Sequence, residues 1–277
     1  MTDAFQGPHQ ELAVVIGAGG MGMAAARRMA QRYRLLLADI DEQRVTERAA
    51  QLREEGGQVA GIACDVTDPA SVQRLAGEIA QIGRFRALVH VAGLSPSMAD
   101  FDTIMRVNLM GVAHVAEGLL PFASSGTAAV LISSLAAHHF TPPAAIAALL
   151  NEPTRPDLVG ALRAALGEAQ ATPEAAYQLS KWGVNSYCRR NVRAWGDRGA
   201  RIVSLSPGLI ATPMGALELE ARPAKRRLLE QSPLRREGTM LEIADAIEFL
   251  VSDKASFISG TDLLVDGGIA AAIAPAQ

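Results

Sequence analysis

The sequence predicts an α/β protein, with a doubly wound sheet of about seven parallel strands in one domain over residues 1–277. Two observations favour this fold class. Short apolar runs alternate with longer amphipathic segments, which is typical of parallel strands covered by helices on both faces. A glycine-rich turn also follows the first apolar run and opens an Ala-rich helix. No break in composition marks a second domain.

The expected strands are short apolar runs of five to nine residues. In chain order they are LAVVIG (12–17), LLLAD (35–39), QVAGIACD (58–65), RALVHVAG (86–93), TAAVLISS (127–134), ARIVSLSPG (200–208) and TDLLVDGG (261–268). Helices are expected between them. Asp41 stands near the start of one, and Asp68 followed by Pro69 is a strong start signal for the next. A long helix is expected over about 102–120, and another carries Tyr177.

Composition excludes several functional classes. The chain has a net charge of −3 and no basic tract, so nothing indicates nucleic-acid binding. Its two cysteines form no spaced set, and no metal site or disulfide framework is expected. The first ten residues do not resemble a signal peptide, and no run of 18 apolar residues indicates a membrane span. A cytoplasmic location is therefore expected.

The first strand leads into GAGGMG, in which Gly17, Gly19 and Gly22 fit the dinucleotide fingerprint G-x-G-x-x-G. Glycines let the backbone approach a pyrophosphate, and the helix N-terminus offers free N–H groups to it. The expected cofactor contacts in the loop are Gly17, Gly19, Gly20, Met21 and Gly22. An acidic residue 22 positions after Gly17 completes the pattern.

That acidic residue, Asp39, ends the second strand and is placed to accept hydrogen bonds from the adenosine ribose. Its charge would repel a 2′-phosphate, so NAD is predicted in preference to NADP. No Arg or Lys lies in the glycine loop or immediately after Asp39. At the end of the third strand, Asp65 and Val66 are expected beside the adenine.

The stretch YQLSK places Tyr177 and Lys181 one helical turn apart, so they share a helix face. With the glycine loop, HVAG, RVNLMG, LISS, SPGLIATP and LLVDGG, it forms an ordered set over residues 12–268. The set resembles the short-chain dehydrogenase/reductase family, whose domain is a Rossmann fold. The resemblance implies an NAD(P)-dependent oxidoreductase that assembles as a homodimer or homotetramer.

The resemblance also implies the role of each site residue. Tyr177 would be the catalytic acid/base and would also contact the cofactor. Lys181 would lower the pKa of Tyr177 and hydrogen-bond the nicotinamide ribose. Ser134, rather than Ser133, would orient the substrate oxygen, and Asn108 would hold a water in a proton relay. The remaining cofactor contacts would be Ala92, Gly93, Pro207, Gly208, Ile210 and Thr212.

Two departures from the family pattern concern the loop and the fourth strand. Ile16 replaces the usual Thr before the glycine loop. The loop is also one residue shorter than usual if Gly17, Gly20 and Gly22 are aligned. The usual Asn-Asn-Ala-Gly is HVAG here, and His90 is expected to be a strand residue rather than a catalyst.

A third departure is the length between Ser134 and Tyr177, 43 positions apart. The extra segment, about 138–173, reads as a helical insertion with an apolar stripe formed by Leu158, Leu162 and Leu166. It would either cover the substrate site or pack at a subunit interface. A similar insertion occurs in relatives resembling 3α-hydroxysteroid dehydrogenase/carbonyl reductases, which hints at a bulky, steroid-like substrate.

The sequence therefore predicts an NAD-dependent enzyme that interconverts a hydrophobic secondary alcohol and its ketone. The alternatives are a dehydratase or epimerase that retains its cofactor, and a nucleotide-sensing protein without turnover. Met214 and the helix after it, to about Glu230, are expected to bind substrate. His138 and His139 are expected to be surface or hinge residues.

Overall fold

The computed structural model describes residues 11–212 and 223–273, which form a seven-stranded parallel sheet. The strand order is β3-β2-β1-β4-β5-β6-β9, which confirms the predicted fold class. The strands are β1 (Glu11–Ile16), β2 (Arg34–Asp39), β3 (Val59–Ala63), β4 (Arg84–His90), β5 (Ala128–Ile132), β6 (Arg201–Pro207) and β9 (Asp262–Val265). The order reverses between β1 and β4, where such sheets open a ligand crevice at their carboxyl ends.

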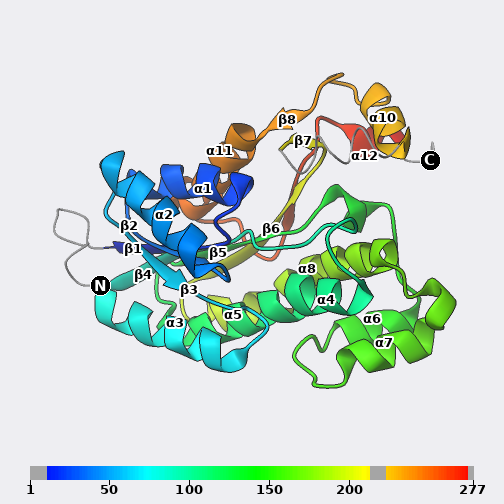
Figure 1. Cartoon of the computed structure of the whole chain (residues 1–277), viewed down its shortest axis with the longest axis horizontal. Helices are drawn as coiled ribbons and strands as arrows, with labels where there is room; N and C mark the ends of the chain where they lie inside the picture. Colours follow the sequence, from blue (N-terminus) through cyan, green and yellow to red (C-terminus); the bar gives the residue numbers. More distant parts are fainter. Residues whose placement is uncertain (1–10, 213–222, 274–277) are drawn as a thin grey trace.

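Helices cover both faces of the sheet (Figure 1). On one face lie α1 (Gly20–Ala30), α2 (Glu42–Glu54) and α11 (Met240–Val251). On the other lie α3 (Pro69–Ile82), α4 (Phe101–Met105), α5 (Val112–Leu119) and α8 (Pro173–Gly196). Alternate strand residues enter two apolar cores, as in Val14 on the α3–α8 side and Val15 on the α1–α11 side.

Side-chain caps explain several helix starts. The Asp41 carboxylate accepts the N–H of Arg44, and the Asp68 carboxylate accepts two backbone N–H groups at the start of α3. Thr172 caps α8 through the N–H of Ala175. The first two caps were predicted from the sequence, because Asp before a helical pattern satisfies N–H groups that lack an intrahelical partner.

The single helix expected over 102–120 is interrupted by a π-helical turn, η2 (Arg106–Gly111), between α4 and α5. Gly111 lies here against Val66, where an added Cβ would come within 2.5 Å of a Val66 methyl carbon. Asn108 lies in the same turn and is completely buried. The π turn is typical of functional positions in helices.

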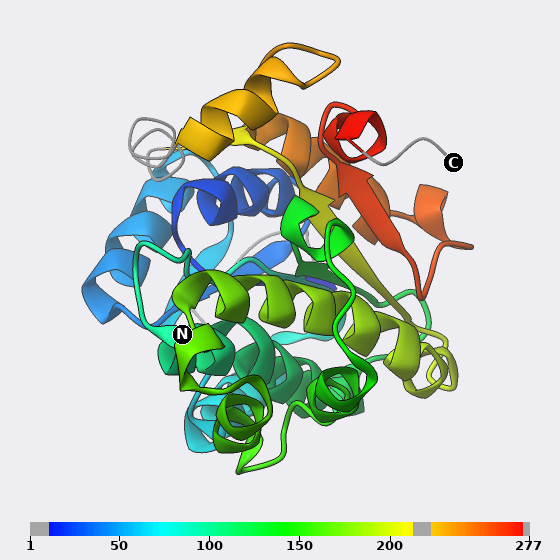
Figure 2. The ribbon, with the colours of Figure 1, turned by 90° about the vertical axis from the view of Figure 1, so that its right-hand side faces the viewer.

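The insertion forms α6 (Ala144–Leu150), α7 (Leu158–Leu166) and the short η5 (Glu168–Gln170). Leu158 and Leu162 are fully buried in the core shared with α4 and α8, which confirms that the stripe packs against the protein. Arg163 also pairs with Asp102 at the start of α4, at 2.7 Å. Figures 1 and 2 both place α6 and α7 beside α4 and α8, on the side away from the sheet.

The remaining elements follow β4, β5 or β6 or lie near the C-terminal end. They are η3 (Leu120–Phe122), η4 (Leu135–His138), β7 (Ile210–Ala211), α10 (Pro223–Glu230), β8 (Gly238–Thr239), η6 (Asp253–Ala255) and α12 (Ile269–Ile273). The sequence did not predict the small β7–β8 pair. Met214, assigned above to a substrate-binding segment, lies outside the described residues. Within 11–212 and 223–273 no helix combines the length and apolarity that crossing a bilayer requires.

Candidate active site

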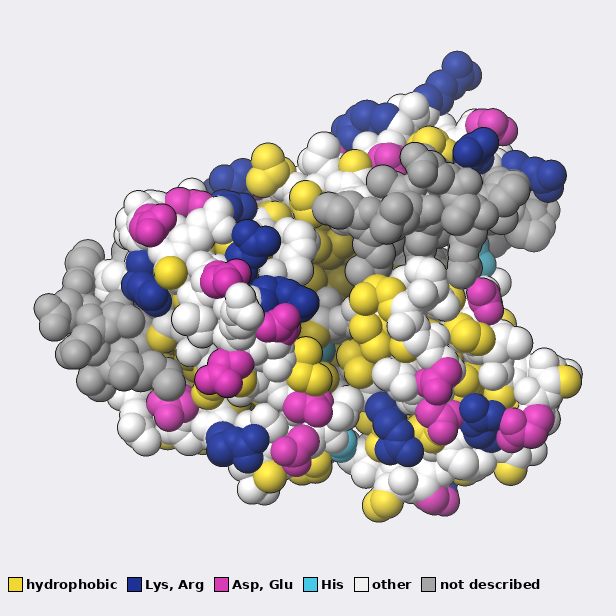
Figure 3. Space-filling model, viewed as in Figure 1, with side chains coloured by type: hydrophobic (Ala, Val, Ile, Leu, Met, Phe, Trp, Pro, Cys, Tyr) yellow, Lys and Arg dark blue, Asp and Glu magenta, His cyan; other side chains and the backbone are white. Residues whose placement is uncertain are grey.

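A cavity of about 670 Å³ opens at the carboxyl ends of the central strands. Ligand pockets commonly have volumes of 300–1,000 Å³. Figure 3 shows hydrophobic side chains gathered in the hollow near the middle of this face. With the exception of Asn108, every predicted catalytic and cofactor-binding residue lines this cavity. The fold thus brings together residues from seven separate segments of the chain.

The glycine loop is sterically restricted at two of its positions. Gly17 has φ +101°, and a Cβ there would lie 2.8 Å from the backbone nitrogen of Ala92. A Cβ on Gly22 would lie 1.8 Å from the Gly17 carbonyl oxygen. A Cβ on Gly19 would meet no protein atom within 4 Å, so its open side faces the cavity. This bare backbone at a helix N-terminus fits a pyrophosphate.

Gly22→Ala should therefore deform the loop. We expect a loss of about 1–3 kcal/mol in the free energy of unfolding, typical of overpacking, and at least about a tenfold loss of cofactor affinity. Denaturant titration and calorimetric titration with NAD and NADP measure both. Gly160→Ala, where a Cβ meets nothing within 4 Å, is the control. Unchanged cofactor affinity in Gly22→Ala would contradict the assignment of the loop.

Asp39 is held by three donors at the end of the cavity where the adenosine ribose is expected. Its carboxylate accepts the N–H of Ala18 at 2.7 Å and the N–H of Asp41 at 3.0 Å. Arg44, on α2, donates to it at 3.3 Å. The sequence argument missed Arg44, because its five-residue separation from Asp39 hides their contact. A cation thus lines the cavity close to the acid that was expected to stand alone.

Two groups lie where the adenine is expected. Asp65 and Val66 line the cavity, but the Asp65 carboxylate is occupied locally by the N–H and hydroxyl of Thr67, at 2.8 and 2.7 Å. Asp65 can therefore shape the wall while its carboxylate holds a turn. Ile40, which the sequence argument did not name, also lines the cavity and is 69% exposed. Its apolar side chain suits the face of an aromatic base.

Tyr177, Ser134 and Lys181 meet in the deeper part of the cavity. The Lys181 ammonium lies 5.8 Å from the centre of the Tyr177 ring. Ser134 follows β5, caps η4 by accepting the N–H of Ala136, and hydrogen-bonds the Tyr177 side chain. Ser133 turns away and donates to the Lys181 carbonyl oxygen at 2.8 Å. This difference favours Ser134 over Ser133 as the group that meets a substrate oxygen.

The direction of the Tyr177 pKa differs from the sequence-based expectation. Burial raises the pKa of Tyr177 above its ordinary value of 10.0, and the hydrogen bond with Ser134 only partly opposes this. Burial also lowers the pKa of Lys181 to about 8, from an ordinary 10.5. Desolvation of the buried phenol therefore dominates, and the expected lowering of the Tyr177 pKa by Lys181 is not found in this cavity. A neutral phenol is the form that donates a proton to a ketone.

Asn108 is not among the residues that line the cavity. Its side chain hydrogen-bonds the backbone of the segment that follows β4. Its side-chain oxygen accepts the N–H of Leu94 at 2.7 Å, and its side-chain nitrogen donates to the Leu94 carbonyl at 2.9 Å. A Cβ on Gly93 would lie 3.3 Å from the Asn108 oxygen and 3.5 Å from the Lys181 nitrogen. The amide thus fixes the loop beside Lys181, and its second N–H is not used in these two bonds.

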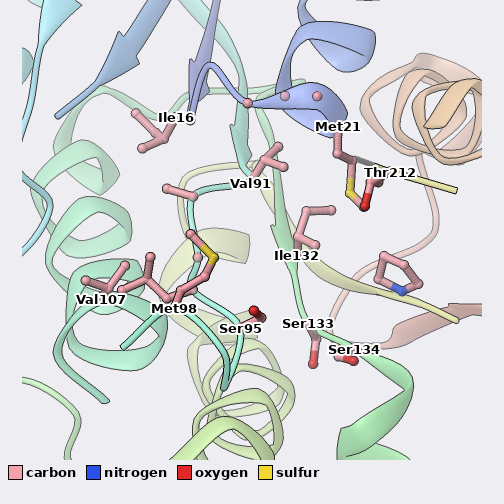
Figure 4. A pocket seen from close by; sticks show the side chains of 18 of the residues that line it. Ile16, Met21, Val91, Ser95, Met98, Val107, Ile132, Ser133, Ser134 and Thr212 are labelled. Carbon is pink, nitrogen blue, oxygen red and sulfur yellow. The ribbon is translucent and has the colours of Figure 1, made fainter. Parts of the chain in front are cut away.

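Another part of the wall comes from the chains that follow β4 and β6. Pro207, Gly208, Ile210 and Thr212 line it after β6, and Ala92 and Gly93 after β4. Figure 4 shows Met98 and Val107 on one side of the cavity, with Met21 and Thr212 near each other on another. His138 lies outside the lining and hydrogen-bonds Asp262 at 2.8 Å.

The sequence argument missed the apolar part of the wall. Leu94, Ser95 and Met98 follow β4 directly, and Val107 lies on η2. Met98 is half exposed, although it is a large apolar side chain. Only their position directly after a predicted strand could have identified these residues, because loops at the carboxyl ends of parallel strands form the site in such sheets. No residue of 138–173 lines the cavity, so the insertion does not cover it.

His90 makes a pH dependence of stability testable. Burial and the Lys181 charge lower the pKa of His90 to about 3, from 6.5. Between pH 6.5 and pH 3, His90 is protonated in the unfolded chain but stays neutral in the folded protein. The free energy of unfolding therefore falls as the pH drops from 6.5 towards 3. We expect this residue to contribute about 1.4 kcal/mol per pH unit in that range. Denaturant titrations of the protein and of His90→Asn should differ by that slope, and equal slopes would contradict the assignment.

Comparisons with known proteins identify the family. A family model described as short chain dehydrogenase matches residues 11–146, and one described as enoyl-(acyl carrier protein) reductase matches 161–270. The short-chain dehydrogenase/reductase bsc3 of Alternaria brassicicola is 33% identical over 94% of this chain and 95% of its own. The chain belongs to the short-chain dehydrogenase/reductase family. Family members use NAD or NADP, which the glycine loop and cavity fit.

Other relatives are named for different substrates. The D-threitol dehydrogenase of Mycolicibacterium smegmatis is 32% identical, over 93% of this chain and 92% of its own. The 3-alpha-hydroxysteroid dehydrogenase/carbonyl reductase of Comamonas testosteroni is 29% identical, over 82% and 92%. The crystal structure of gox2181 superposes with a TM-score of 0.76 at 25% identity, over 98% of this chain and all of that one. The resemblance seen in the sequence is confirmed.

Proposed function

We propose that this short-chain dehydrogenase/reductase interconverts a hydrophobic secondary alcohol and its ketone, with NAD as the cofactor. The observation that carries the proposal is the meeting of Tyr177, Ser134 and Lys181 beside an apolar wall of Leu94, Met98 and Val107. The named activities of the relatives, on threitol and on hydroxysteroids, support the alcohol/ketone class. A cytoplasmic location and a homo-oligomeric assembly stay predictions.

The mechanism follows from the positions of the side chains. A nicotinamide dinucleotide, when bound, supplies or accepts the hydride. Ser134 hydrogen-bonds the substrate oxygen and orients it towards Tyr177. In ketone reduction, the neutral Tyr177 phenol donates its proton to the oxygen that gains charge. Lys181, held by its bond to the Ile132 carbonyl at 2.9 Å, binds the ribose and supplies positive charge while Tyr177 is deprotonated.

The raised pKa of Tyr177 gives the two directions different pH dependences. Ketone reduction needs the neutral phenol, which is present at neutral pH because its folded pKa lies above 10.0. Alcohol oxidation needs the phenolate and should accelerate as the pH rises. The measurement that tests the function is a screen of cyclic ketones, steroids and aromatic alcohols, followed by the absorbance of the reduced cofactor. The proposal would be contradicted if the protein turned over none of these compounds.

The NAD preference rests on the Asp39 carboxylate. We expect Asp39→Asn to gain about tenfold or more in NADP affinity, because the charge that repels a 2′-phosphate is gone while Arg44 becomes available to it. NAD affinity should fall only several-fold. Calorimetric titrations of both cofactors measure this, with Asp68→Asn, a helix cap outside the cavity, as the control. A strong NADP preference in the unmodified protein would contradict the proposal.

A further inference from the structure

His90 is a buried polar residue that the proposed mechanism does not use. It ends β4, opposite Ile16 on one neighbouring strand and Leu131 on the other. Its side chain is 1% exposed. Because strand residues alternate, it faces the same side as Leu88, whose core includes residues of α4, α5 and α8. An imidazole thus occupies a core position at the carboxyl end of the sheet, one residue before the cavity wall begins at Val91.

Both ring nitrogens of His90 lack a hydrogen-bond partner among the described residues, and both are shielded from solvent. Leaving a buried polar group unsatisfied costs about 1–3 kcal/mol in general, and such groups in native proteins nearly always find a protein or water partner. The imidazole must therefore pair with a group that can approach it within the core.

Lys181 is a buried charged residue whose ammonium lies at the carboxyl end of β5, the strand beside β4. Lys181 is 4% exposed, and its ammonium donates to the Ile132 carbonyl, although an ammonium carries three donor hydrogens. Gly93, three residues after His90, passes 3.5 Å from the Lys181 nitrogen when measured from an ideal Cβ. His90 pairs in the sheet with Leu131, and the carbonyl that accepts from Lys181 belongs to the next residue, Ile132, so both side chains lie near the carboxyl ends of β4 and β5. The Lys181 charge accordingly lowers the pKa of His90.

Other polar groups around Lys181 are already occupied or remote from His90. The Asn108 amide bonds the N–H and the carbonyl of Leu94. Tyr177 faces the cavity with Ser134.

Charged groups on the packed elements point elsewhere. Arg106 on η2 is exposed, and Asp102 on α4 pairs with Arg163 of the insertion. On η4, His138 pairs with Asp262 of β9. A neutral His90 nitrogen is therefore an available acceptor for the Lys181 ammonium among the described residues.

We propose that His90 is a positioning residue for Lys181, accepting a hydrogen bond from its ammonium through one internal water. The proposal rests on the role of Lys181 in the function proposed above. A neutral acceptor stabilises the charged form of a buried lysine, which burial otherwise disfavours. His90 stays neutral throughout the working pH range because its own pKa is about 3. It therefore helps to keep Lys181 charged without forming an ion pair.

The test is the pH profile of ketone reduction, measured as kcat and KM. Activity that needs a charged Lys181 declines above its pKa, which is about 8. We expect the decline to begin about one pH unit lower in His90→Leu, because an acceptor to the charged form is lost. His90→Asn, which keeps an amide acceptor, should lie between the two. Leu88→Ala, on the same face of β4, is the control for a general loss of packing and should not move the decline.

An unchanged profile in His90→Leu, or an equal shift in Leu88→Ala, would overturn the inference. A second readout does not depend on activity or on how His90→Leu folds. The nitrogen chemical shifts of the labelled His90 ring should report a neutral imidazole from pH 5 to 9, and Lys181→Met should change the shift of one ring nitrogen. Identical shifts in Lys181→Met would also overturn it. Failure of the proposed function would appear separately, as full activity in Tyr177→Phe.

Discussion

Tyr177→Phe should lower kcat about 10²- to 10⁴-fold, the range in which a positioned acid or base contributes to catalysis. The phenyl ring keeps the packing and removes only the proton donor. Cofactor affinity should stay within about twofold, because binding depends on the glycine loop and Asp39 rather than on the phenol. Steady-state kinetics with the best substrate of the screen and calorimetric titration of the cofactor measure the two effects separately.

The matched control for this change is Tyr187→Phe. Tyr187 lies on the same helix α8, is 5% exposed and does not line the cavity. Its loss of a hydroxyl should leave kcat unchanged. A Tyr177→Phe protein with full activity would show that another group moves the proton, and the proposed mechanism would then be wrong.

Lys181→Met should damage both turnover and cofactor binding. The methionine matches the length of the apolar stem but lacks the ammonium that supports Tyr177 and binds the ribose. A hydrogen bond to a charged group contributes about 1.5–3 kcal/mol, so cofactor affinity should fall about ten- to a hundredfold. Turnover should fall by at least as much as in Tyr177→Phe, because phenolate formation loses its only nearby charge within the described cavity.

The contrast between these variants separates the two roles. Tyr177→Phe should affect turnover alone, whereas Lys181→Met affects turnover and binding together. Lys254→Met, in η6 outside the cavity, controls for the loss of one positive charge. If Lys181→Met bound the cofactor as tightly as the unmodified protein, Lys181 would not hold the ribose.

Features that depend on local sequence were predictable. Apolar runs gave the strands, and Asp41 and Asp68 marked helix starts, because a capping carboxylate acts within three residues. The glycine loop was also predictable, since a Cβ on Gly22 would clash with the carbonyl of Gly17, only five residues earlier. The gathering of site residues from the ends of separate strands was predictable, because parallel strands bring their carboxyl ends to one edge of the sheet.

Features that depend on tertiary contacts were not predictable. The π turn at Asn108 depends on how the helix meets the chain after β4. Arg44 reaches Asp39 across the start of α2, and the raised pKa of Tyr177 depends on how deeply the helix buries it. The packing of the insertion also required the structure. An apolar stripe indicates that one face of a helix is buried, but it does not indicate which surface that face packs against.

The most direct measurement follows the hydride itself. A secondary alcohol carrying deuterium on the carbinol carbon, chosen from the active compounds of the screen, is incubated with the protein and NAD. The account predicts that the deuterium appears in free reduced cofactor, in equal amount to the ketone formed. Ketone formation with the deuterium released to water, or turnover of the alcohol without any free reduced cofactor, would contradict it.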